Sequence, residues 1–192
     1  MGRWQPGSTE RLEHAALDLF AEQGFADTTV PQITARAGLT TRTFFRHFAD
    51  KREVLFSGDD LLPERVAALL ADVPPTVGPM ELVADRLAPA VSGVFEGRSL
   101  GYLLRRRAVV AAEPALQERE LRKFSAMVDA LEQGFVDRGV DRWTAQLVAE
   151  LAVAAFRVAA GRWLDQRGTP DLATVMDETL AAMRHVVSTP SM

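Results

Sequence analysis

Two short helices predicted between residues 29 and 48 constrain the fold of this sequence more than any other feature. Thr29 is a favourable N-cap, and Gln32 completes a capping box with it. Gly38 ends this helix after two turns, and Thr40 caps a second helix that runs to Phe48. Two capped helices joined by a glycine, which can adopt a positive φ, predict a helix-turn-helix.

The remainder of the chain also shows helical periodicity, and no alternation typical of strands is present. Apolar residues at three- and four-residue spacing predict a first helix over Thr9–Gln23. Asp50 and Glu53 form another capping box, which predicts a fourth helix that Gly58 and Pro63 interrupt at a hinge. The fourth helix should resume to about Asp72, and the later helices are predicted at Pro79–Glu96, Ser99–Ala112, Pro114–Arg138, Asp141–Gln166 and Asp171–Ser188.

These elements predict an all-α protein of about nine helices. We expect an N-terminal three-helix domain with the helix-turn-helix over residues 1–56, and a longer C-terminal helical domain over residues 57–192. Both lengths lie within the usual range for domains.

Charge is distributed unevenly between the two predicted domains. The net charge is −4, and all of it belongs to residues 57–192, because residues 1–56 carry seven residues of each sign. Within the first domain, residues 36–52 contain a single acid, Asp50. The same segment contains five bases: Arg36, Arg42, Arg46, Lys51 and Arg52. A compact basic patch on a weakly acidic protein is typical of a domain that binds nucleic acid phosphates.

Composition argues against several other functions. The chain has no cysteine, which excludes disulfides, thiol nucleophiles and cysteine-ligated zinc. The three histidines, His14, His47 and His185, are far apart in the sequence, so we expect no metal site, no catalytic residue and no cofactor. No apolar run is long enough to span a membrane, and Met1–Gly7 lacks the hydrophobic segment of a signal peptide. A cytoplasmic location is therefore expected.

The second helix of the motif has an apolar side and a polar side. Residues predicted to pack inward with Leu19 and Phe20 are Ile33, Ala37, Leu39, Phe44 and Phe48. Residues left on the outer side are Thr41, Arg42, Thr43, Phe45, Arg46 and His47. The N-terminal end of such a helix enters the major groove of DNA, where hydroxyls and an arginine can contact base edges.

The segment Arg11–Phe56 resembles the DNA-binding domain of the tetracycline-repressor (TetR) family. The matching motifs are LF-x-E-x-GF at residues 19–25, TTV at 28–30, I-x-x-x-AG at 33–38, and T-x-F-F-R-H-F followed by K at 43–51. The match covers about a quarter of the chain. It implies a homodimer that binds a near-palindromic DNA operator and responds to a small-molecule effector, most often as a repressor.

By this resemblance, Thr41 and Arg42 approach bases, and Lys51 holds a phosphate. The whole predicted DNA-contacting set is Thr29, Thr40, Thr41, Arg42, Thr43, Phe45, Arg46, His47 and Lys51. Many relatives have tyrosine where this chain has Phe45. Without the hydroxyl, Phe45 offers only apolar contact, for example to a thymine methyl group.

Residues 57–192 are similar to relatives described as having an acyl-CoA-like ligand-binding domain, which implies an acyl-CoA-like or hydrophobic effector. The predicted ligand-binding residues are Phe95, Tyr102, Leu103, Arg106, Phe124, Met127, Leu131, Phe156 and Trp163. The alternative for the apolar residues is an ordinary helical core. Three consecutive arginines, 105–107, span about 200° of a helix, so they cannot all face one pocket.

The last two predicted helices resemble the dimerisation helices of the family, which form an intermolecular four-helix bundle. The predicted interface comprises Leu147, Leu151, Ala155, Val158, Leu172, Met176, Leu180, Met183 and Val187. The alternative for these stripes is burial within one subunit.

Two other functional classes compete with a regulator. A small-molecule binding protein with an inactive DNA domain would have lost basic residues from the motif, yet Arg42, Arg46, His47 and Lys51 are present. An all-helical enzyme would need a catalytic constellation, and neither a cysteine nor a glycine-rich phosphate loop accompanies the three histidines.

Overall fold

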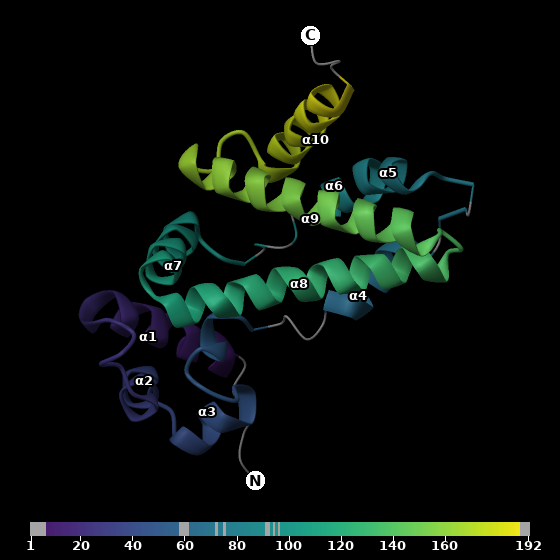
Figure 1. The fold of residues 1–192 in the computed structure, drawn as a ribbon. Helices are drawn as coiled ribbons and strands as arrows, with labels where there is room; N and C mark the ends of the chain where they lie inside the picture. Colours follow the sequence, from purple (N-terminus) through teal and green to yellow (C-terminus); the bar gives the residue numbers. More distant parts are fainter. Residues whose placement is uncertain are drawn as a thin grey trace. The chain divides into compact units, whose positions relative to one another are not determined.

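The computed structural model describes residues 7–57, 62–71, 73–74, 76–90, 93, 95 and 97–188, with the side chains of residues 62, 63, 71, 187 and 188 left out. Every regular element in these ranges is helical, which confirms the all-α class (Figure 1). The chain divides into two compact units. The first unit contains residues 1–60 and 101–122, and the second contains residues 61–100 and 123–192.

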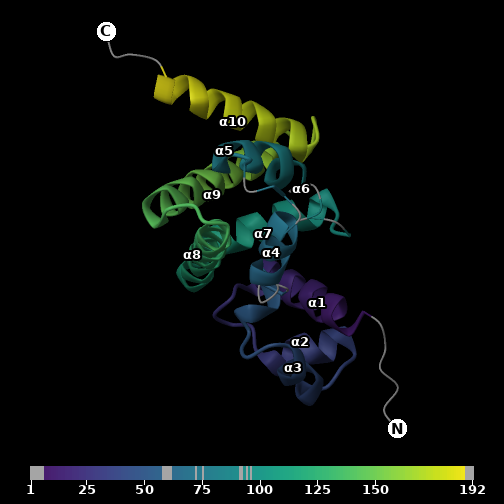
Figure 2. The same ribbon diagram turned by 90° about the vertical axis from the view of Figure 1, so that its right-hand side faces the viewer.

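The first unit is built around α1 (Ser8–Gln23), which packs against α2 (Val30–Ala37) and the 3-10 turn η1 (Glu53–Leu55). The short helix α3 (Thr41–His47) packs against α2, and the three helices lie together in Figure 2. One face of α1 is fully buried. The core residues of this unit include Leu12, Leu17, Phe20, Ile33, Phe44, Phe48, Val54 and Phe56.

The unit also contains α7 (Leu100–Ala112) and the first turns of α8 (Pro114–Asp137), which differs from the predicted linear boundary at residue 56. The reason is a buried carboxylate on α1. Glu13 is only 5% exposed, accepts a hydrogen bond of 3.4 Å from the Tyr102 hydroxyl of α7, and also accepts one from Ser57. The His14 ring contacts the ring of Tyr102 with centroids 5.0 Å apart. Residues 1–56 therefore lack partners that α7 and Ser57 supply.

The second unit places α9 (Arg142–Asp165) against α10 (Leu172–Ser188) and α5 (Pro79–Leu82). Small side chains on α9 allow this close packing, since Ala145, Ala149 and Ala159 are completely buried. The helix α4 (Leu62–Ala71) also approaches α8 closely, because a Cβ at Gly134 would lie only 2.5 Å from Leu70 Cδ1. The predicted boundaries of the last four helices agree with the structure to within a residue or two.

The predicted helix Pro79–Glu96 is not regular. It consists of α5, the π-helical turn η3 (Val83–Leu87) and the short α6 (Ala88–Ala90). The Ala88 amide donates to the carbonyl of Val83, five residues back. Pro89 follows immediately, and a proline lacks an amide donor and clashes with the carbonyl four residues before it. A wider turn at this point accommodates the proline.

The prediction of a fourth helix from the Asp50 cap was wrong. Asp50 Oδ1 accepts from the amides of Arg52 and Glu53 at 2.7 and 3.3 Å, but only the turn η1 follows. The Glu53 side chain binds Arg119 instead of completing a capping box. The next helix in the structure, α4, begins at Leu62, and the predicted hinge at Gly58–Pro63 falls mostly outside the described residues.

Candidate nucleic-acid interface

The helix-turn-helix has the local geometry that its sequence predicts. Thr29 Oγ1 accepts from the Gln32 amide at 3.4 Å, and Gln32 Oε1 accepts from the Thr29 amide at 2.8 Å. Gly38 adopts a left-handed conformation with φ of 63° at the turn. A Cβ at Gly38 would lie 2.9 Å from Nη2 of Arg11, which donates to the Ala37 carbonyl. The positive φ therefore favours glycine, and a larger residue would also displace the end of the Arg11 side chain.

The helix α3 is fixed by its apolar side. Thr40 Oγ1 caps it by accepting from the Thr43 amide at 3.1 Å. Phe44 and Phe48 are buried, with ring centroids 5.3 Å apart. The opposite side of the helix, called here the α3 outer face, is exposed and consists of Thr41, Arg42, Phe45 and Arg46. Phe45 is 59% exposed.

The threonines of the predicted DNA-contacting set differ in their availability. The hydroxyls of Thr29 and Thr40 serve as helix caps, and that of Thr43 lies 3.0 Å from Thr40 Oγ1. Thr41 makes none of these cap contacts and stands at the start of α3. Of the four threonines, Thr41 is therefore the one on the α3 outer face.

His47 lies behind the α3 outer face and is half-buried. Its Nε2 lies 3.0 Å from Ser8 Oγ, and its Nδ1 lies 3.5 Å from Thr9 Oγ1. Burial lowers the pKa of His47 below the ordinary histidine value, and the neighbouring charge of Arg46 lowers this pKa further. The neutral imidazole thus joins the end of α3 to the start of α1.

The side chain of Lys51 is hydrogen-bonded to backbone carbonyl groups. Its Nζ donates to the carbonyl oxygens of Phe25, Ala26 and Thr28 at 2.6, 3.3 and 2.9 Å. The ammonium group also lies 4.2 Å from the centroid of the Phe25 ring. In this arrangement Lys51 closes the loop between α1 and α2. No sequence signal links residue 51 to this loop, so the contact could not be predicted.

The predicted basic patch is reduced by internal pairing. Arg36 forms two hydrogen bonds with Glu22 at 2.6 and 2.7 Å, and Arg52 pairs with Asp50 at 2.6 Å. The first pair raises the pKa of Arg36 and lowers that of Glu22. Among the five bases of the patch, Arg42 and Arg46 have no carboxylate or carbonyl partner in the described residues. Both belong to the α3 outer face.

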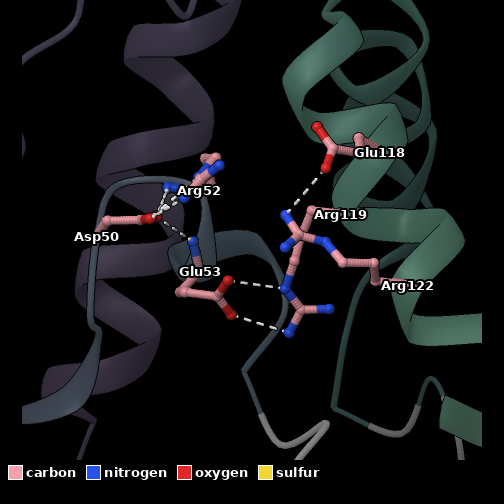
Figure 3. Close-up of polar contacts among 6 residues, drawn as sticks. All are labelled: Asp50, Arg52, Glu53, Glu118, Arg119 and Arg122. Atoms are coloured by element: carbon pink, nitrogen blue, oxygen red, sulfur yellow. Dashed lines mark hydrogen bonds and ion pairs between the residues drawn. The ribbon is translucent and has the colours of Figure 1, made fainter.

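The arginines of the α7–α8 corner, defined by Arg105, Arg106 and Arg119, are paired (Figure 3 shows Arg119). Arg119 donates to both oxygens of Glu53 at 2.7 and 2.8 Å. Arg106 donates to Glu120 at 2.9 Å and to the Leu55 carbonyl at 3.0 Å.

The ring of Phe56 lies 4.8 Å from the guanidinium carbon of Arg106 and, separately, of Arg119. Arg105 pairs with Asp18 of α1 at 2.9 Å. Together these contacts attach the turn η1 and α1 to the α7–α8 corner.

The predicted ligand-binding residues do not form one group. Tyr102, Leu103 and Arg106 belong to the first unit. Residues that pack in or against the core of the second unit are Phe95, Phe124, Met127, Leu131, Phe156 and Trp163. A different part of that unit contains an open cavity of about 310 Å³, lined by Met80, Glu81, Ala84, Asp85, Leu180 and Arg184.

The predicted interface residues are also divided. Leu147 and Val158 are exposed on α9, Leu151 and Met183 are half-buried, and the Val187 side chain lies outside the described residues. The residues buried in their own subunit are Ala155, Leu172, Met176 and Leu180. The stripe on α10 is thus directed largely toward α9 rather than to the surface. Trp143, which is 77% exposed, and Ala154 lie in the same row of α9 as Leu147 and Val158.

No described helix is long and apolar enough to cross a membrane. The described part of the chain likewise contains no cluster of three or more histidines and acids that could hold a metal ion.

Comparison with known protein families identifies the family to which this helical chain belongs. The family model "Bacterial regulatory proteins, tetR family" matches residues 13–57, and the model "MftR C-terminal domain" matches residues 81–188, more than half of the chain. The protein belongs to the TetR family. Its helix-turn-helix unit is therefore that of a transcriptional regulator. TcmR of Streptomyces glaucescens, an HTH-type transcriptional regulator, is 28% identical over 80% of this chain and 72% of its own length.

Solved TetR-family structures share the fold of this TetR-family chain. SmeT is the repressor of the multidrug efflux pump SmeDEF in Stenotrophomonas maltophilia. Its complex with triclosan superposes on this chain with a TM-score of 0.59 at 22% identity, over 92% of this chain and 91% of SmeT. FadR of Thermus thermophilus in complex with lauroyl-CoA gives a TM-score of 0.57 at 22% identity, over 96% and 97% of the two chains.

Proposed function

We propose that the protein is a ligand-responsive repressor that binds a near-palindromic operator as a homodimer. The observation that carries this proposal is the α3 outer face, where Arg42 and Arg46 are exposed beside Phe45 while the neighbouring bases are paired. Two exposed arginines on α3 with no acidic partner among the described residues suit a polyanion. The same observation argues against an inactive DNA domain.

The proposed DNA contacts follow from the position of each side chain on α3. Thr41 and Arg42 stand at the N-terminal end, which enters the major groove, so Arg42 is the base-contacting arginine. Arg46 lies one turn later and binds the phosphate backbone. Phe45 packs its exposed ring against a thymine methyl group.

The proposed dimer interface is the α9 outer row, defined as Trp143, Leu147, Ala154 and Val158. These residues recur at spacings of four and seven, so they lie along one face of α9 and are exposed. A tryptophan, a leucine and a valine exposed in one row are typical of an interface between subunits. A dimer would present two α3 helices to half-sites about 34–36 Å apart.

The proposed effector is an apolar small molecule bound in the second unit. Two proteins of similar fold have been solved with apolar or partly apolar molecules bound, SmeT with triclosan and FadR with lauroyl-CoA. Arg105 and Arg106 are engaged with Asp18, Glu120 and a backbone carbonyl, which makes them poor candidates for gripping coenzyme A phosphates. A hydrophobic effector therefore suits this chain better than an acyl-CoA.

The test is fluorescence anisotropy with DNA from upstream of the protein's own gene, and with genomic fragments where that DNA is not bound. Wild type should bind tightly, with two protomers per site and with strong salt dependence. Arg42→Ala should lose about tenfold or more in operator affinity and much of the base discrimination. Arg36→Gln is the matched control, because Arg36 is paired with Glu22, and it should bind almost as wild type.

The dimer is tested by sedimentation of Leu147→Glu and Val158→Glu, two charges placed in the α9 outer row. Both variants should fold, because both side chains are exposed, and should sediment as monomers with weakened operator binding. Leu121→Glu changes another exposed leucine, on α8, and serves as the control that stays dimeric. A wild-type monomer, or no binding to any genomic fragment, would overturn the proposed function.

A further inference from the structure

The α9 outer row is flanked by two charged residues that have no ion-pair partner in the described part of their own subunit. Glu150 and Arg157 are both exposed. The ion pairs that α9 makes there involve Arg142 and Arg162 instead. The Arg157 guanidinium lies 4.9 Å from the centroid of the Phe124 ring on α8, a contact that leaves its charge without a carboxylate. Glu150 and Arg157 are about 10.5 Å apart along the helix, so they lie on one edge of the row without pairing.

The outer face of α9 has the spacing of a helix that packs against a second helix. Its apolar and small members recur at alternating intervals of four and three residues, the heptad spacing of paired helices: Leu147, Leu151, Ala154, Val158 and Gly161. Ala154 lies at the middle of this series, and Glu150 and Arg157 follow one edge of it. The opposite edge, formed by Leu151 and Val158, is apolar. The face therefore combines an apolar strip with one charged edge.

We propose that α9 packs antiparallel against α9 of a second copy of this chain, with the two helices crossing at Ala154 and Glu150 of each subunit bound to Arg157 of the partner subunit. A two-fold axis through the crossing point makes the contact isologous, so each pair of opposite residues occurs twice. This inference rests on the proposed function, because it assigns the residue contacts within the proposed dimer.

The two charges decide between the two ways of pairing a helix with its own copy. A two-fold axis parallel to α9 gives parallel helices, in which Glu150 and Arg157 would each lie beside the same residue of the partner, so that like charges meet. A two-fold axis perpendicular to α9 gives antiparallel helices. With the crossing at Ala154, Glu150 lies about 6 Å from the axis and Arg157 of the partner subunit about 4.5 Å from it on the same side. The antiparallel arrangement alone therefore supplies each charge with a partner.

The apolar residues fit the same register. Ala154 has a small side chain at the crossing point, where two packed helices come closest. Leu147 and Gly161 are each seven residues from Ala154, so Leu147 of one subunit faces Gly161 of the partner subunit. A Cβ at Gly161 would meet no neighbouring atom within 4 Å, so the space over this glycine is open within its own subunit. The large side chain therefore opposes the position that lacks one.

The experiment uses the absence of cysteine from the chain. Cysteines introduced into the full-length protein report which positions face each other, because a disulfide requires Cα atoms within about 7 Å. Ala154→Cys should form a disulfide-linked dimer under mild oxidation, since the two copies of residue 154 meet at the axis. Leu147→Cys should not, because its two copies lie about 21 Å apart along the helices, whereas the double variant Leu147→Cys with Gly161→Cys should be linked. Ser125→Cys, exposed on α8, is the control that stays unlinked.

Charge exchange tests the ion pair itself. Glu150→Arg opposes two arginines at both symmetric contacts, and should weaken the dimer about tenfold in sedimentation equilibrium. Arg157→Glu should do the same by opposing two acids. The double variant restores opposite charges between the subunits, and should return to nearly the dissociation constant of the wild type. Asp129→Arg makes the same change of charge at an exposed position of α8, and is the matched control that leaves the dimer unchanged.

A disulfide that forms in Leu147→Cys as readily as in Ala154→Cys would show parallel helices and overturn the proposal, as would a dimer in which no α9 cysteine is linked. A double charge variant that dimerises no more tightly than either single variant would overturn the ion pair. Sedimentation and operator binding of the wild type are measured alongside. A wild-type dimer that binds the operator while these links are missing refutes this register alone, whereas a wild-type monomer refutes the proposed function as well.

Discussion

The α3 outer face and the α7–α8 corner use arginine in opposite ways. Arg42 and Arg46 project from α3 without an acidic partner in the described structure, beside an exposed phenylalanine. At the corner, Arg119 binds Glu53 through two hydrogen bonds, Arg106 binds Glu120, and both lie against the ring of Phe56. Both regions belong to the same compact unit.

This contrast shows that arginine content alone does not indicate function. The sequence contains a basic cluster at residues 36–52 and a triplet at 105–107, and each suggests an anion site. Pairing within the subunit removes most of these charges from such a role. The pair on α3 is available for a partner, whereas the corner arginines hold α7 and the start of α8 against α1 and η1.

The largest effect is expected from removing Arg119, which tests whether the corner arginines have a structural role. The Arg119 side chain is 14% exposed, and Arg119→Met leaves the Glu53 carboxylate partly buried without its partner. We expect a loss of about 2–3 kcal/mol in the free energy of unfolding, measured by urea denaturation. The double variant with Glu53→Met should recover part of this loss. Lost operator affinity at unchanged stability would contradict a structural role for the corner.

Lys51→Met distinguishes the two roles considered for this lysine. Loss of three carbonyl contacts should lower the free energy of unfolding by about 1–2 kcal/mol. The salt dependence of operator binding should stay the same. If Lys51 instead held a phosphate, the slope of log K against log salt would fall by about 1, and stability would change little.

Phe45→Tyr sharpens the description of the α3 outer face. The added hydroxyl can donate to a phosphate, so operator affinity should rise a few-fold, roughly 0.5–1 kcal/mol. Stability should not change, because the ring is largely exposed. Phe45→Leu keeps an apolar contact and is the control that should bind close to wild type. Weaker binding of the tyrosine variant would place Phe45 against bases in a site without room for a hydroxyl.

The smallest expected effect is a pH dependence from His47. Its lowered pKa means that the unfolded chain takes up a proton at a higher pH than the folded protein does. The stability that neutral His47 contributes is therefore complete above the ordinary histidine pKa and is lost as the pH falls through the lowered value. Urea midpoints between pH 7.5 and 5 should show this loss in wild type and less of it in His47→Gln. Identical profiles for the two proteins would exclude His47 as the cause.

The lowered pKa of Asp50, which Arg52 causes, acts in the same direction at a lower pH. Measuring stability only above pH 5 separates the effect of His47 from that of Asp50, because the Asp50 carboxylate stays charged in that range.

Local signals made much of the fold predictable. The caps at Thr29 and Thr40, the turn at Gly38 and the glycines and prolines that end the later helices depend on neighbours within four residues. The inward and outward sides of α3 followed from helical spacing alone. Where a local signal competed with a distant partner it failed, as at Glu53, which binds Arg119 instead of capping a helix.

The residues of the candidate site were harder to interpret because their partners are distant in sequence. Lys51 contacts carbonyls more than twenty residues away, and His47 contacts Ser8 at a separation of 39 residues. The stripe of α10 illustrates a second difficulty. Leu172, Met176 and Leu180 have the same helical spacing whether they face a partner subunit or their own α9, and the structure shows the latter.

The discontinuous first unit has a consequence for the engineering of sensors. Regulators with new inputs are often made by grafting an N-terminal DNA-binding segment onto a foreign effector domain. In this chain such a graft at residue 56 would separate Glu13 from Tyr102 and Ser57, and would separate Glu53 from Arg119. A functional chimera must therefore exchange residues 101–122 together with residues 1–60, as two segments that have been fitted to each other.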